Sequence, residues 1–180
     1  ADLNWDAVKG YLARCQNGAA SGSENEGGFS YRPNESKAGV VTNEQGIAVF
    51  RSYGTMTYAG LLSLIYANVD RTDSRVRSAV DWASRHWTLE ENPGMGQEGR
   101  YYFYNILAKA LAASGRTELT VPDRKQPLAW RRELAEKLVA LQKPADEAGQ
   151  GFWINDAGRW QEADPVLVTC YVILALQAAQ

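Results

Sequence analysis

A unit of helix, loop and helix recurs along the chain, and this repeat restricts the possible folds more than any other feature of the sequence. In the first copy an apolar helical stripe ends at Gln16, and a Gly-Gly-Phe step follows at Phe29. The third copy has Gln142 followed by Phe152 and Trp153. Such periods are typical of stacked helical units, so residues 1–180 are predicted to form one domain of three repeats, each of roughly 60 residues.

The middle copy carries His86 where the other two have glutamine, four residues after an apolar helix residue. A planar side chain at a helix end can bond the unpaired backbone groups there. An aromatic ring from the next loop can stack on it and hold the hairpin together. We therefore interpret these positions as structural staples between repeats. The predicted staple residues are Gln16, Phe29, His86, Gln142, Phe152 and Trp153.

Each repeat predicts two helices of different character. Apolar residues at intervals of three and four predict helices at about 5–15, 53–68, 73–87, 101–114, 128–142 and 164–180. The first, third and fifth have a charged face, whereas the second, fourth and sixth carry almost no charge in their middle. β-Branched residues favour a strand at 166–176, but the length of this segment favours a buried helix. The pattern predicts an all-α protein with an outer ring, an inner buried ring and long Gly-rich loops.

Composition excludes several classes of protein. Nineteen Lys and Arg against 21 Asp and Glu give a net charge of −2, which argues against a nucleic-acid partner. Thr169 interrupts the longest apolar run, so no transmembrane segment is predicted. One histidine and two cysteines without a CxxC motif predict neither a metal site nor a cofactor. Pairing of Cys15 with Cys170 stays open, as does the compartment of a protein expected to be soluble.

The repeats resemble the glutamine–tryptophan repeat of squalene–hopene cyclases and their relatives, the terpenoid cyclase/protein prenyltransferase α/α-toroid superfamily. Residues 51–58, 91–97, 101–104 and 164–169 resemble bacterial proteins described as prenyltransferase/squalene-oxidase-repeat proteins. The resemblance covers nearly the whole chain. It implies an α/α-toroid arc of three helical hairpins with six main helices, about half of a full toroid.

Half a toroid would leave apolar surface exposed at its ends. Two copies of the chain could close a ring by two-fold symmetry. Alternatively, the chain is part of a larger protein, or it docks on another protein as an accessory subunit. We favour the latter two explanations over the first.

The catalytic residues that the resembled enzymes use are absent from this sequence. The cyclases use an Asp-x-Asp-Asp cluster and the prenyltransferases an Asp/Cys/His zinc set, and this sequence has neither. Asp70 and Asp73 are predicted to lie at an exposed helix start. A pair of carboxylates distant in sequence stays open. We therefore predict a non-catalytic binding or scaffold module; the alternative is a fragment of an enzyme that acts on an apolar isoprenoid substrate.

The starts of the three inner helices combine aromatic side chains with a few polar groups, as ligand pockets do. Helix N-termini would favour an anionic group there. The alternative is that the tyrosines are ordinary core residues. The expected ligand is an isoprenoid or another apolar molecule. The candidate rim residues are Arg51, Tyr53, Tyr58, Arg100, Tyr101, Tyr104 and Asp164, and the same stretches carry Thr55, Tyr102, Trp160 and Glu162.

Overall fold

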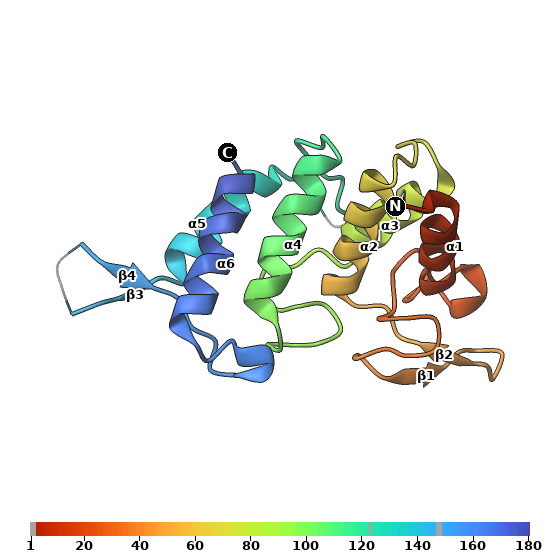
Figure 1. Ribbon diagram of the computed structural model, residues 1–180, viewed down its shortest axis with the longest axis horizontal. Helices are drawn as coiled ribbons and strands as arrows, with labels where there is room; N and C mark the ends of the chain where they lie inside the picture. The colour runs from red at the N-terminus through yellow and green to blue at the C-terminus, as the bar shows by residue number, and fades with distance from the viewer. Residues whose placement is uncertain (1–2, 123, 147–148) are drawn as a thin grey trace.

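Six helices form the core of the protein, which we describe from a computed structural model covering residues 3–122, 124–146 and 149–180. The helices lie close to the predicted ranges. They are α1 (Trp5–Cys15), α2 (Gly54–Tyr66), α3 (Ser74–Arg85), α4 (Arg100–Ala113), α5 (Trp130–Ala140) and α6 (Pro165–Ala178), with short 3₁₀ turns at Ala19–Ser21 and Arg159–Gln161 (Figure 1).

Three of these helices begin at a residue whose side chain caps the helix. The Asn4 side chain accepts a hydrogen bond from the backbone nitrogen of Ala7 at 3.0 Å. Asp73 and Asp164 accept from the second residue of α3 and α6 at 2.9 and 2.8 Å. Pro165 occupies the first turn of α6, where its missing N–H costs no hydrogen bond. These caps are local, which explains why the sequence locates the helix starts well.

The prediction of a purely all-α chain needs correction, because two short antiparallel strand pairs join the helices. β1 (Val40–Thr42) pairs with β2 (Ala48–Phe50), and β3 (Lys143–Pro144) pairs with β4 (Gly151–Phe152). In the first pair, Asn43 closes the turn because its side-chain oxygen accepts hydrogen bonds from Gln45 and Ile47. The loops expected to be Gly-rich and irregular thus contain short strand pairs.

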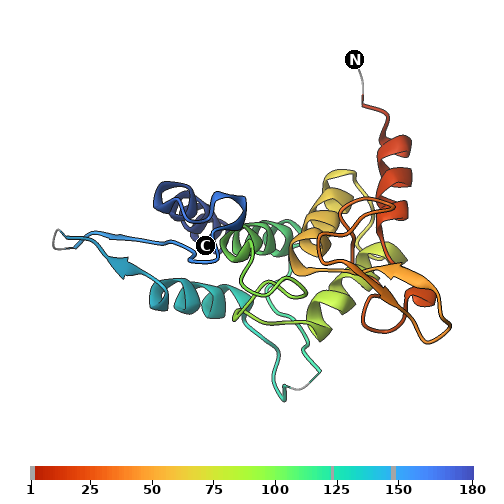
Figure 2. The same ribbon diagram turned by 90° about the horizontal axis from the view of Figure 1, so that it is seen from below.

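The helices form two layers. α2, α4 and α6 lie side by side in one row, and α3 and α5 lie behind it (Figures 1 and 2). α4 is the centre of the core, with nine of its residues buried. α1 stands beyond α2 at one end of the row, and Cys15 is the buried residue of this helix.

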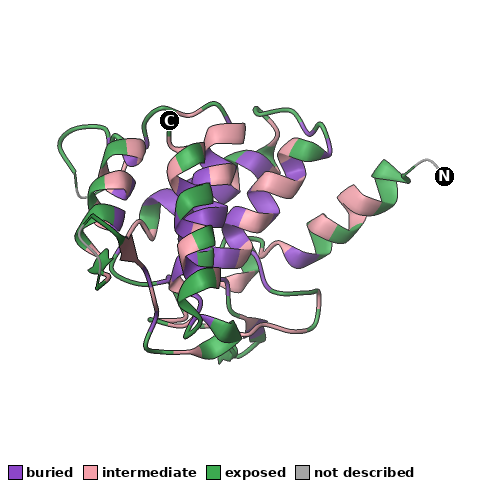
Figure 3. Cartoon of the chain, turned by 60° about the vertical axis from the view of Figure 1, so that its left-hand side comes forward, coloured by how far each residue is buried: buried purple, intermediate pink, exposed green. Residues whose placement is uncertain are grey.

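The expectation that α6 is buried was only partly right. Val168, Val172 and Ala175 are buried on the side that packs against α4. Val166 and Ile173 on other sides are 71% and 55% exposed. Figure 3 brings α6 forward and shows buried and exposed segments along it. Helices of the described chain cover one side of α6, so its apolar composition alone did not decide its burial.

Cys15 and Cys170 are both free thiols, the first buried and the second exposed. The question of their pairing, which the sequence left open, is thus answered for the structure. Across the described residues, every helix is too short or too polar for a bilayer crossing.

Candidate ligand-binding site

An aromatic cavity of about 340 Å³ lies at the N-terminal ends of α2, α4 and α6. Segments of all three repeats contribute aromatic rings to its wall. Polar groups are few, and Glu162 is the acidic residue among the described lining. The lining consists of Tyr31, Lys37, Tyr53, Thr55, Met56, Gly99, Tyr102, Trp160, Glu162 and Tyr171.

Four tyrosines line this cavity, and burial raises the pKa of two of them. Tyr53 precedes α2 with an extended backbone and is 3% exposed, and burial raises the pKa of its phenol. Tyr102 of α4 and Tyr171 of α6 face each other with ring centres 5.4 Å apart and planes at 55°. Burial also raises the pKa of Tyr171. The wall therefore offers uncharged aromatic surface near neutral pH.

Trp160 reaches the cavity from a backbone that most residues avoid. Its φ is 56° and that of Gln161 is 64°, both in the left-handed region. Such residues cost of order 1–3 kcal/mol each and persist where the surroundings impose them. The Trp160 ring lies against Gly99, where an added Cβ would be 2.8 Å from Cζ3 of the ring. Arg159 lies 4.4 Å above the ring and pairs with Glu98. These contacts fix the ring at the mouth of the cavity.

Glu162 is fully buried, and its carboxylate accepts hydrogen bonds from the first turn of α4. Its Oε1 accepts a hydrogen bond from the backbone nitrogen of Tyr102 at 2.8 Å. Its Oε2 accepts from Asn155 Nδ2 at 2.6 Å and from the backbone nitrogen of Tyr101 at 3.4 Å. A carboxylate at a helix N-terminus is stabilised by the free N–H groups and the helix dipole. The acid therefore ties the loop before α6 to the start of α4, and both of its oxygens accept hydrogen bonds from the protein.

The other helix starts are also satisfied from within the chain. Asn92 Oδ1 accepts from the backbone nitrogen of Thr55 in α2 at 3.0 Å, and Asp164 caps α6. The predicted anionic group at the helix N-termini is thus supplied by the protein itself. A ligand of the aromatic cavity therefore meets helix starts that are already bonded, and the one cation of the described lining, Lys37, is paired with Glu35.

Tyr53 is the one candidate rim residue that lines the aromatic cavity. Tyr58, Tyr101 and Tyr104 point into the core, where each is at most 2% exposed, and burial raises the pKa of all three. Tyr104 donates its hydroxyl to the Leu89 carbonyl at 2.5 Å. For these three residues the alternative interpretation, ordinary core tyrosines, describes the structure.

The remaining rim residues lie in three different places. Arg100 lies 5.3 Å above the ring of Tyr101, and its Nε is buried without a hydrogen bond to any described residue. Asp164 caps α6. Arg51 lines a second, polar cavity described below.

The staple residues of the first repeat bridge segments that are distant in sequence. Gln16 Nε2 donates to the carbonyls of Gly27 at 3.0 Å and Arg75 at 2.8 Å. The amide thereby ties the first loop to the start of α3. The ring of Phe29 lies on Gly60 of α2, where a Cβ would come within 2.5 Å of it. The expected stacking of Phe29 on the amide is replaced by packing on α2.

Near the C-terminal end of α5, the indole of Trp153 makes the hydrogen bond to the helix that was expected from Gln142. Trp153 Nε1 donates to the Leu138 carbonyl at the end of α5, at 2.7 Å. Gln142 lies against Gly151, where a Cβ would be 2.5 Å from its amide nitrogen. Phe152 lies in β4 opposite Lys143. Trp153 therefore connects the helix to the following loop.

His86 follows α3 and stacks on Trp82, with ring centres 4.3 Å apart and planes at 30°. Its Nε2 is buried and makes no hydrogen bond within the described chain. Burial lowers the pKa of the imidazole below its ordinary 6.5, and the Glu24 carboxylate opposes this shift. His86 is the C-cap residue of α3, and it caps the helix through its backbone nitrogen, which donates to the Trp82 carbonyl at 3.0 Å.

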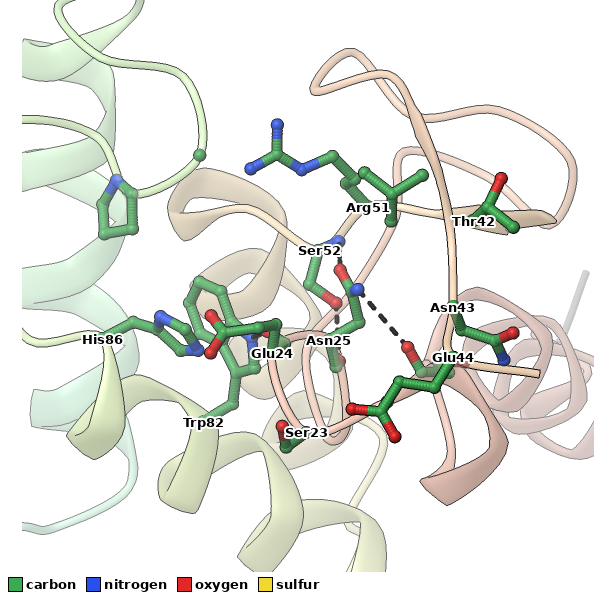
Figure 4. Close-up of a pocket in the computed structure, with 15 residues that line it drawn as sticks. Ser23, Glu24, Asn25, Thr42, Asn43, Glu44, Arg51, Ser52, Trp82 and His86 are labelled. Atoms are coloured by element: carbon green, nitrogen blue, oxygen red, sulfur yellow. Dashed lines mark hydrogen bonds between the residues drawn. The ribbon is translucent and has the colours of Figure 1, made fainter. Parts of the chain in front are cut away.

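A second cavity of about 380 Å³ lies beside His86, between α3, the first loop and the β1–β2 hairpin. Figure 4 shows His86 and Glu24 on one side, and Thr42, Asn43 and Glu44 on the other. Its lining is polar where that of the first cavity is aromatic. Among described residues no cluster of three His, Cys, Asp or Glu side chains could hold a metal ion.

Sequence reasoning missed Tyr31, Lys37 and Tyr171 of the aromatic cavity. Tyr31 follows the Gly-Gly-Phe step by two residues, which is the signal that could have placed it beside the helix starts. Comparisons of the chain with protein-family models, curated proteins and solved structures find no match.

Proposed function

We propose that this chain is a non-catalytic binding module whose aromatic cavity takes a small, neutral, apolar ligand such as an isoprenoid. The observation that carries the proposal is the convergence of five aromatic rings from all three repeats on one cavity. Pockets of a few hundred Å³ with aromatic walls and few polar groups are typical of small-molecule sites. A charged ligand would lose its hydration shell on binding, and no free helix N-terminus would compensate by donating hydrogen bonds to it.

Two features support binding over catalysis. Both carboxylate oxygens of Glu162 accept hydrogen bonds from within the protein. A general acid needs a proton to donate towards the substrate. Burial raises the pKa values of Tyr53 and Tyr171, so the phenols of these two residues are poor bases near neutral pH. The alternative of an enzyme fragment acting on an isoprenoid has no comparable support in the cavity.

We propose further that the fold is an arc of an α/α-toroid that works within a larger assembly. The row of α2, α4 and α6 with α3 and α5 behind it is consistent with an inner and an outer ring (Figure 2). The exposed apolar side chains Val166, Ile173 and Leu174 on α6 mark the surface where a neighbour would pack. This neighbour is another protein subunit or a second copy of the chain, and we favour the former.

Titration of the protein with trans,trans-farnesol, an uncharged isoprenoid alcohol, tests the binding proposal. We expect saturable binding by calorimetry, with a matching change in tryptophan fluorescence because Trp160 borders the cavity. Trp160→Ala and Tyr102→Ala should each weaken binding at least fivefold, since each removes one wall of the cavity.

Tyr66→Ala serves as the control, because Tyr66 lies at the far end of α2 and is 65% exposed. It should bind farnesol as the wild type does. Absence of saturable binding, or equal binding by Trp160→Ala and wild type, would contradict the proposal.

A further inference from the structure

We propose that the polar cavity beside His86 is a second binding site, specific for a neutral polyhydroxylated ligand, that is, a sugar. It lies apart from the aromatic cavity, and the two have no lining residue in common. Some polar groups of the cavity are bonded within the protein, and others are open to a ligand.

One set of polar side chains builds the frame of this cavity. Asn25 Oδ1 accepts from the backbone nitrogen of Ser52 at 2.9 Å, and the Ser52 hydroxyl donates to the Asn25 carbonyl at 2.8 Å (Figure 4). Asn17 Nδ2 donates to Ser52 Oγ at 2.9 Å. Asn43 Nδ2 donates to the Ala20 carbonyl at 2.7 Å. These bonds lock the first loop and the β1–β2 hairpin around the cavity.

Close backbone packing holds the same frame. Gly28 leaves no room for a side chain, because a Cβ there would lie 2.4 Å from Cβ of Ser52 and 2.9 Å from Nε1 of Trp82. Trp82 Nε1 donates to the Glu24 carbonyl at 2.9 Å and so fixes the loop on α3. The wall is therefore pre-formed, which reduces the cost of ordering it on binding.

A second set of side chains points at the cavity without partners of its own. Apart from His86, these side chains are exposed to solvent and make no hydrogen bond or ion pair with another described residue, whereas Nε2 of His86 is buried without a partner. A buried polar atom without a partner is costly, so a ligand or water is expected to bond it. The open side chains are Ser23, Glu24, Thr42, Glu44, Arg51 and His86.

The mixture of these groups selects the class of ligand. Glu24 and Glu44 accept hydrogen bonds, and Arg51 donates several in a fixed planar geometry. The hydroxyl groups and a neutral imidazole can each donate one hydrogen bond and also accept. Sugar hydroxyls are donors and acceptors at once, so they can bond both kinds of group. The excess of one negative charge disfavours phosphates and other anions, and Arg51 disfavours organic cations.

Saturation-transfer NMR with a panel of D-glucose, D-galactose, D-mannose, N-acetyl-D-glucosamine and cellobiose tests this proposal. We expect at least one member to bind. Glu24→Gln and Arg51→Gln should each raise its dissociation constant at least fivefold, because both remove charge-assisted hydrogen bonds. Both variants should fold normally, since neither side chain bonds another described residue.

Glu118→Gln is the matched control, because Glu118 is exposed and does not line the cavity. It should bind the same sugar as the wild type does. Failure of the whole panel to bind, or equal binding by Glu24→Gln, Arg51→Gln and wild type, would overturn the proposal. Farnesol titrations of the same variants report on the aromatic cavity separately.

Discussion

The Glu162 carboxylate lies at the first turn of α4, with its Oε1 2.8 Å from the backbone nitrogen of Tyr102. A residue of the loop before α6 thus caps α4. Asn155, from the same loop as Glu162, donates to the other oxygen. The contact ties this loop to α4 at the wall of the aromatic cavity.

Glu162→Gln should lower the free energy of unfolding by about 1–3 kcal/mol, the range for a hydrogen bond to a buried charged group. The amide that replaces one oxygen would face the N–H donors of α4 or Asn155. Urea denaturation measures the difference, with Glu118→Gln as an exposed control. A midpoint equal to that of the wild type would mean that Glu162 does not hold the repeats together.

Gly99→Ala tests the contact between Gly99 and Trp160. Gly99 has φ +65°, and an added Cβ would lie 2.8 Å from the Trp160 ring. Gly96 has a similar φ of +60° but nothing within 4 Å of its Cβ position, so Gly96→Ala carries the backbone strain alone. We expect Gly99→Ala to melt lower than Gly96→Ala and to displace Trp160. Equal melting temperatures would contradict the close contact.

Trp153→Ala should lower the free energy of unfolding by about 1–4 kcal/mol, because it removes a buried aromatic ring and its hydrogen bond to Leu138. Trp153→Phe keeps most of the ring and should lose about 1 kcal/mol. Gln142→Ala should fall in the lower part of the same range, since Gln142 is exposed. An unchanged melting curve for Trp153→Ala would refute its role as a staple.

The contribution of Asp73 to the free energy of unfolding should depend on pH. Hydrogen bonds from Arg75, from its side chain first and then its backbone, lower the pKa of Asp73 to about 2. The folded pKa lies below the ordinary 3.8, so the contribution of the carboxylate is full above that value and is lost as the pH falls towards 2. Asp73→Ala should destabilise by about 1 kcal/mol at pH 7.

This difference between Asp73→Ala and wild type should shrink as the pH falls through the same window. Urea denaturation at a series of pH values measures it. Asp73→Asn is the control, because asparagine retains the capping oxygen and should lose less at neutral pH. A pH-independent difference for Asp73→Ala would contradict the assignment.

Features that depend on neighbours in sequence could be predicted, and those that depend on distant contacts could not. The caps Asn4, Asp73 and Asp164 act within three residues, so the helix starts were predicted correctly. The burial of α6 depends on what packs beside it, and composition does not contain that information. The β1–β2 pair depends on the turn at Asn43, whose acceptor role a polar stretch conceals.

The candidate site follows the same rule. The helix starts were a correct place to look, and Tyr53 lines the aromatic cavity. Which tyrosines face the core depends on the rotation of α4 about its axis, and this placed Tyr101 inside and Tyr102 in the cavity. Tyr31 and Lys37 arrive from the first loop, whose path is set by contacts with α2 and α3.

Native mass spectrometry of the protein, gently purified from the cells that produce it, tests the central claim most directly. The account predicts that the wild-type chain retains an adduct of small-molecule mass. A Tyr102→Ala/Trp160→Ala double variant, which lacks two walls of the aromatic cavity, should lose this adduct while its circular dichroism spectrum stays that of the wild type. A wild-type chain that carries no adduct and does not bind farnesol on addition would contradict the account.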